Sequence, residues 1–151
     1  MPVSKSGGTG ILSTLLIEAE HLNYLFPEDS DETVTFTAGG VDNTFGAWAE
    51  IVDNNAVSLS SKCTSDMHIS SIIAESSSLR DKIYVLEISY GSAKIVIGRA
   101  RMLSATNQIG HTVQERMRNL LIPKGEKIYY RLKCETADAI ATVHFRYHYH
   151  S

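Results

Sequence analysis

The residues best suited to chemistry lie at the carboxyl end of the chain. Side chains that could bind a metal or an anion occupy alternate positions there: His144, Arg146, His148 and His150. The positions between them are apolar or aromatic: Val143, Phe145, Tyr147 and Tyr149. Successive side chains of a strand point to opposite faces, so this pattern predicts a strand with one polar face.

This polar face has three interpretations, namely a solvated or partner-contacting surface, a pH-sensitive contact and a metal site. Residues two apart on a strand are about 7 Å apart, so His148 and His150 could chelate a metal. His144 is about 13 Å from His148 and would struggle to join them. We favour partner contact through His144, Arg146 and His148, and expect neither a metal nor a cofactor.

The chain lacks the spacing of known catalytic sites. The glycines of GGTG (7–10) are similar to part of a phosphate-binding loop, but Lys5 precedes them, whereas such a loop needs a lysine after them. Neither a GxSxG nor an HExxH motif occurs, and Glu50, Glu75 and Glu87 have no sequence reason to converge. We therefore expect a protein that is not an enzyme, with an uncharacterised β-sandwich enzyme as an alternative.

Aromatic side chains could instead stack on a sugar ring. The candidates are Trp48, Tyr129, Tyr130, Tyr147 and Tyr149. Most aromatic residues of the chain fall at alternating strand positions, which core packing explains better. A carbohydrate-binding module therefore stays an alternative.

Short alternating runs separated by turn residues predict the elements that position these side chains. Expected strands cover 33–38, 45–53 in a hairpin with 57–61, 68–75, 82–90 in a hairpin with 94–103, 128–133 and 139–150. The run 11–26 is interpreted as extended. The segment 111–121 has helical spacing at Val113, Met117 and Leu120 and could be a helix. We nevertheless assign it to β.

Eight or nine strands without strand–helix alternation predict an all-β protein, a β-sandwich and most plausibly a jelly roll of about eight strands. Residues 11–151 are expected to form one domain, preceded by an extended N-terminal arm, residues 1–10, that its own domain would not order. The predicted core residues are Phe36, Trp48, Leu86, Ile88, Ile95, Ile97, Ile128, Leu132, Val143 and Phe145. No run approaches 18 apolar residues and the start lacks a signal peptide, so no membrane contact or export is expected.

Charge is divided unevenly along the 151 residues. The net charge is -3, with -9 in residues 1–75 and +6 in residues 76–151. The cations alternate with apolar residues in predicted strands, which argues against dedicated nucleic-acid binding. Two interpretations remain, charge balance within one domain and complementary surfaces between subunits.

Cys63 and Cys134 have no metal-ligand spacing and are expected to be buried thiols, with a disulfide as the alternative.

The segments KIYVLEISYGSAKIVIGRARM and LLIPKGEKIYYRLKCETADAIATVHFRYHY resemble the C-terminal half of small jelly-roll virion proteins of tailed bacteriophages. The similarity covers residues 45–150. Its most recognisable part is a turn of the form hydrophobic-Pro-x-Gly-x-x-hydrophobic, here IPKGEKI (122–128), leading into a strand that ends RLKC. The stretch before this turn is extended in that family, which is why 111–121 is assigned to β.

The resemblance implies a capsid decoration or cement protein, made in the host cytoplasm and located on the virion surface. It also implies binding to the major capsid protein or another virion protein, and a homo-oligomer, most often a trimer. The expected contacts are Pro2, Val3 and Lys5 of the arm and the polar face of the last strand. A jelly-roll protein of the tail, collar or fibre is the alternative within virions.

Overall fold

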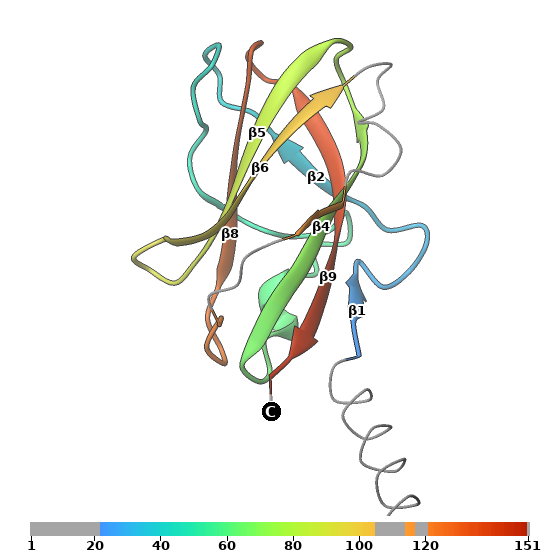
Figure 1. Cartoon of the computed structure of the whole chain (residues 1–151), viewed down its shortest axis with the longest axis vertical. Coiled ribbons are helices and arrows are strands. Elements are labelled where there is room, and N and C mark those ends of the chain that lie inside the picture. Colours follow the sequence, from blue (N-terminus) through green and yellow to red (C-terminus); the bar gives the residue numbers. More distant parts are fainter. Residues whose placement is uncertain (1–21, 105–113, 117–120, 151) are drawn as a thin grey trace, which may run out of the picture.

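The computed structural model describes residues 22–104, 114–116 and 121–150, and Figure 1 shows its strands and their connections. Its strands are β1 (Tyr24–Phe26), β2 (Val34–Thr37), β3 (Ala49–Glu50), β4 (Met67–Ser77), β5 (Lys82–Tyr90), β6 (Ile95–Ser104), β7 (Gln114–Arg116), β8 (Ile128–Cys134) and β9 (Ile140–Tyr149). One 3₁₀ turn, η1 (Leu59–Lys62), is also present. Within these residues, no helix is long and apolar enough to cross a membrane.

The strands form two antiparallel sheets packed as a sandwich. One sheet has the order β1-β9-β4-β7, with β2 also paired to β9, and the other has the order β3-β8-β5-β6. β1 pairs with residues 145–147 of β9 and β2 with residues 140–143, so β1 and β2 share one edge position, interrupted by the loop 27–33. This order is that of a jelly roll, which confirms the predicted fold class.

The β5–β6 hairpin shows how alternation determines the two faces of a strand. Tyr84, Leu86 and Ile88 are fully buried between the sheets, whereas Glu87 pairs with Arg99 on the outer face. The turn after β5 contains Gly91 at φ +75°, a conformation that a residue without a Cβ adopts at little cost. Local sequence signals therefore define this hairpin.

The core lies between the two sheets. Phe36 of β2 stacks on Tyr130 of β8 with ring centroids 3.8 Å apart, which joins the sheets directly. Eight predicted core residues are buried: Phe36, Leu86, Ile88, Ile97, Ile128, Leu132, Val143 and Phe145. The prediction was wrong for Ile95, which is 42% exposed, and for Trp48, whose ring packs against Arg131 on the outer face of β8.

Two further assignments need correction. The predicted hairpin of 45–53 with 57–61 is reduced to β3, a single bridge between Val52 and Ser58, and η1. The Asp53 carboxylate accepts hydrogen bonds from the backbone N–H groups of Asn55 and Val57, so a side chain closes this turn. Of the run 11–26, the structure describes only 22–26, in which β1 confirms an extended chain.

The remaining assignments concern 111–121 and the cysteines. Within 111–121, residues 114–116 form β7 and pair with β4, which confirms β structure there. Residues 111–113 and 117–120 lie outside the described residues. Cys63 and Cys134 are both buried and free, as expected.

Candidate functional site

The polar face predicted for the last strand is present on β9. His144 and His148 are half-buried and Arg146 is exposed, while Phe145 and Tyr147 between them are buried. His144 Nδ1 lies 2.6 Å from Glu75 Oε1 of the neighbouring strand β4. His148 Nδ1 lies 2.7 Å from the Ser70 hydroxyl. Two of the predicted contact residues, His144 and His148, thus contact side chains of β4, whereas the third, Arg146, is exposed.

His68 extends this face and was not singled out from the sequence. It is the direct partner of His148 across β4 and β9, with ring centroids 5.2 Å apart, and its ring lies 5.3 Å from that of His150. Burial, together with the charges of His148 and His150, lowers the pKa of His68. Within the described residues, no group of three or more side chains is arranged to hold a metal. The surroundings of His68 therefore favour its neutral imidazole.

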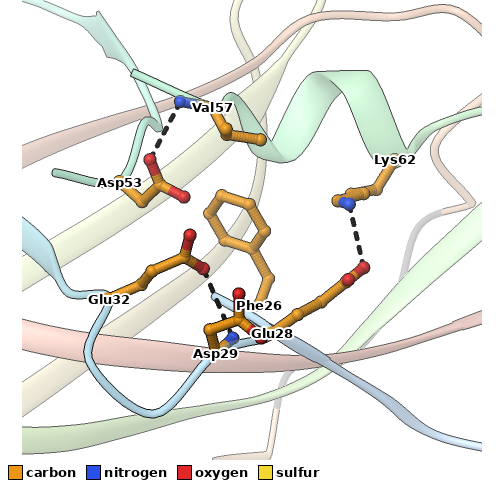
Figure 2. A pocket seen from close by; sticks show the side chains of 7 residues that line it. All are labelled: Phe26, Glu28, Asp29, Glu32, Asp53, Val57 and Lys62. Atoms are coloured by element: carbon orange, nitrogen blue, oxygen red, sulfur yellow. Dashed lines mark hydrogen bonds and ion pairs between the residues drawn. The ribbon is translucent and has the colours of Figure 1, made fainter. Parts of the chain in front are cut away.

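A small cavity of acidic character lies where the loop after β1 meets the segment after β3 (Figure 2). It has a volume of about 100 Å³. Its lining consists of Phe26, Glu28, Asp29, Glu32, Asp53, Val57 and Lys62. The Lys62 ammonium lies 2.8 Å from Glu28 Oε1 and is the sole cation among the described residues that line the cavity. We call this space the acidic cavity.

A more open depression adjoins the acidic cavity, because both are lined by Glu28, Asp29 and Glu32. Its volume is about 230 Å³, and the described residues that line it are Leu25, Pro27, Glu28, Asp29, Ser30, Glu32, Glu75 and His144. We call it the acidic groove. Its apolar part comes from Pro27 and from Leu25, which is 47% exposed. The polar face of β9 therefore continues, through His144 and Glu75, into an acidic surface.

The outer face of the other sheet carries a charged network centred on Glu87. This carboxylate accepts hydrogen bonds from Arg99 Nε at 2.8 Å and from Arg131 Nε at 2.7 Å. Burial would raise the pKa of Glu87, but the hydrogen bonds and charges of the two arginines outweigh burial and lower it. The two positive charges of the guanidinium groups outnumber the single negative charge of Glu87, so the network carries a net positive charge.

Aromatic rings hold the cations of this face in place. The guanidinium carbon of Arg131 lies 4.4 Å from the ring centroid of Phe45 and 4.5 Å from that of Trp48. The ammonium of Lys94 lies 3.8 Å from the ring centroid of Tyr129. Such cation–π contacts orient the charges without neutralising them.

An open groove lies at the end of this cationic face, beside the edge strand β6. Its volume is about 250 Å³ and its lining is Ile83, Arg101, Met102 and Leu103. We call it the cationic groove. Leu103 is 60% exposed, and Arg101 has no ion-pair partner within the described residues. The groove thus combines an exposed apolar surface with an unpaired positive charge.

The sequence identified part of this arrangement. The arm residues Pro2, Val3 and Lys5 lie outside the described residues. The five aromatic candidates do not form one platform, because Tyr147 is buried and Tyr130 stacks on Phe36, whereas Trp48 and Tyr129 lie on the outer face of the other sheet. The grooves were missed, although the acidic loop PEDSDE and the alternating cations of 94–103 were visible in the sequence.

Comparisons with known proteins place few constraints on this arrangement. No protein-family model matches the chain, and no curated protein matches it. The fold is similar to a chain in the structure of the Gt strain of infectious bursal disease virus, with a TM-score of 0.34 and 12% sequence identity. The similarity covers 87% of this chain and 32% of that chain, so this chain spans about a third of its length.

Proposed function

We propose that the chain is a non-enzymatic structural protein of a bacteriophage virion, which binds the outside of an assembled capsid and stabilises it. The observation that supports this proposal is the strand order, because the segment that resembles phage virion proteins, residues 45–150, supplies β3 to β9 of a jelly roll. Its partners are then the major capsid protein or another virion protein, and further copies of this chain, most simply in a trimer.

The turn that carries the resemblance has a defined structural role. Gly125 adopts φ +82°, and its backbone N–H donates to the carbonyl oxygen of Cys63 at 2.9 Å. Before it, Ile122 pairs with Met67 at the start of β4, and after it β8 runs between β3 and β5. The motif therefore links the two sheets at one end of the sandwich.

The surfaces of the sandwich suit a protein with several contacts. The acidic groove belongs to the sheet that contains β1, and the cationic groove to the sheet that contains β6. A lattice-bound protein gains avidity when several weak contacts form at once, so separate surfaces of opposite charge fit attachment to a repeating shell. The surface therefore favours assembly through more than one contact.

The proposal is tested with purified particles of the virus that encodes the chain, separated into heads and tails. We expect the tagged protein to sediment with heads at a saturable number of copies, and not with tails. Sedimentation with tails would favour a tail, collar or fibre protein, and protein left in the supernatant of both fractions would overturn the virion role. Carbohydrate binding, the alternative function, is tested separately on a glycan array with Trp48→Ala as the control. Binding to particles does not require carbohydrate binding.

A further inference from the structure

The two grooves match each other in chemistry. The acidic groove presents the carboxylates of Asp29 and Glu32 beside an exposed leucine, Leu25, while its third carboxylate, Glu28, is paired with Lys62. The cationic groove presents Arg101 beside an exposed leucine, Leu103. Each therefore offers an apolar contact together with the charge that the other lacks.

The grooves lie at opposite edges of the sandwich. β1 and β2 occupy one end of their sheet, and Phe26 at the end of β1 lines the acidic cavity together with Asp53, which follows β3. The edge with the acidic groove is therefore also the β3 edge of the second sheet. β6 is the opposite end of that second sheet, with β8 and β5 between them. One molecule cannot bring its two grooves together.

We propose that these grooves bind each other between two copies of the chain, with β6 of one copy lying along the loop after β1 of the next. The two contact surfaces differ, so the contact is head-to-tail and leaves one free groove at each end of a pair. Such heterologous contacts produce a closed ring when the rotation between copies closes, and a filament when it does not. This association does not depend on a capsid.

Asp29 and Arg101 are suitable test positions, because both side chains are exposed and neither forms an ion pair within the described residues. Asp29→Lys places a positive charge against the cationic groove of the neighbour, and Arg101→Glu places a negative charge against its acidic groove. Like charges brought together oppose association. The double variant D29K/R101E restores opposite charges with the polarity exchanged. Asp138→Lys and Lys124→Glu, at exposed positions outside both groove linings, are the matched controls.

Sedimentation equilibrium of the full chain, at about 100 μM protein and about 20 mM salt, measures the association. We expect the wild type to self-associate and each single reversal to raise the dissociation constant at least about tenfold. D29K/R101E should return close to the wild type, and an equimolar mixture of the two single variants should associate more tightly than either variant alone. A monomeric wild type, or single variants that associate like the two controls, would overturn the inference. Either result leaves attachment to particles, measured separately by pelleting, unchanged.

Discussion

Glu87 lies on the outer face of its sheet, yet its side chain is only 5% exposed, because the side chains of Arg99 and Arg131 cover it. The alternation of β5 predicts which way Glu87 points. It does not predict the burial, because Arg131 is 44 residues further along the chain and reaches Glu87 only when β8 pairs with β5. Contacts between distant strands therefore create a network that local sequence reasoning misses.

Glu87→Gln should lower the free energy of unfolding by about 2 kcal/mol at pH 7, because it removes the charge that two guanidinium groups share in a nearly buried position. The lowered pKa of Glu87 means that this stabilisation is present above the ordinary glutamate pKa and is lost as the pH falls through the folded-state pKa. Urea unfolding should therefore show the difference between the two proteins shrinking at acidic pH. Glu50→Gln is the control, since the ion pair of Glu50 with Lys127 is long, at 3.8 Å, and the Lys127 side chain is 65% exposed, so its loss should change stability by less than about 0.5 kcal/mol.

The protonation of His68 should also make the stability of the fold depend on pH. As for Glu87, stability should fall as the pH falls, but in a higher pH range. Burial and the neighbouring histidines lower the pKa of its imidazole in the folded protein, so the unfolded chain binds a proton more readily. Stability should fall as the pH drops through the ordinary histidine pKa, and His68→Gln should make that fall shallower. Thermal unfolding between about pH 7.5 and pH 5 measures it. Equal pH dependence in the two proteins would contradict this assignment.

At the scale of elements, the sequence predicted strands that pair with neighbours along the chain better than strands that depend on distant partners. The hairpin of β5 and β6 matches its expected bounds closely, because both strands and their turn are local. The two residues of β3 pair with β8, which lies some 80 residues later, and their supposed hairpin partner forms η1. The polar face of β9 was predicted from alternation alone, but its partners Glu75, Ser70 and His68 come from β4.

The crossing from β2 to β3 contains a position that tolerates no side chain. A Cβ at Gly39 would lie 2.2 Å from the backbone oxygen of Thr44 and 2.8 Å from the backbone nitrogen of Gly46. The Gly39 and Gly46 N–H groups both donate to the carbonyl oxygen of Leu132, so the two chain segments cannot separate freely. Gly39→Ala should cost about 3 kcal/mol of stability, as overpacking does.

Gly40→Ala is the matched control for Gly39→Ala. A Cβ at Gly40 would meet only the Asp138 carboxylate, at an ordinary distance of 3.8 Å. Its melting temperature should therefore stay within a few degrees of the wild type, whereas Gly39→Ala should unfold at a clearly lower temperature. Equal melting temperatures for the two variants would show that the crossing relaxes around the added methyl group.

At the scale of the whole molecule, the uneven charge of the sequence corresponds to separate surfaces. The acidic first half supplies the loop 27–33, and the basic second half supplies the outer face of β5, β6 and β8. The sequence showed that two interpretations were open, namely balance within one domain and contact between subunits. It did not show where the charges meet solvent, because that depends on which strands lie at the edges of the sheets.

The N-terminal arm, residues 1–10, contains one charged side chain and almost no apolar surface. Ordering a residue costs about 1 to 2 kcal/mol of backbone entropy, which such a segment cannot recover within its own domain. We therefore expect deletion of residues 2–10 to leave the melting temperature nearly unchanged. The same deletion should weaken pelleting with capsids, because it removes Pro2, Val3 and Lys5, the side chains of the arm that we expect to touch the shell. Equal pelleting of truncated and full-length protein across a salt series would remove the arm from the interface.

The two sheets should unfold together, because they share one hydrophobic core. Phe36 of one sheet stacks on Tyr130 of the other, and the backbone of Ala38 bridges to Leu132. Loss of either sheet would expose the buried face of its partner, which makes a stable half-folded state costly. Trp48 is the one tryptophan of the chain and reports on the outer face of β8, whereas far-UV circular dichroism reports on all strands. The two signals should give the same urea midpoint and the same slope. A tryptophan transition at lower urea would show that the β3 edge, with its short strand, separates before the rest of the sandwich.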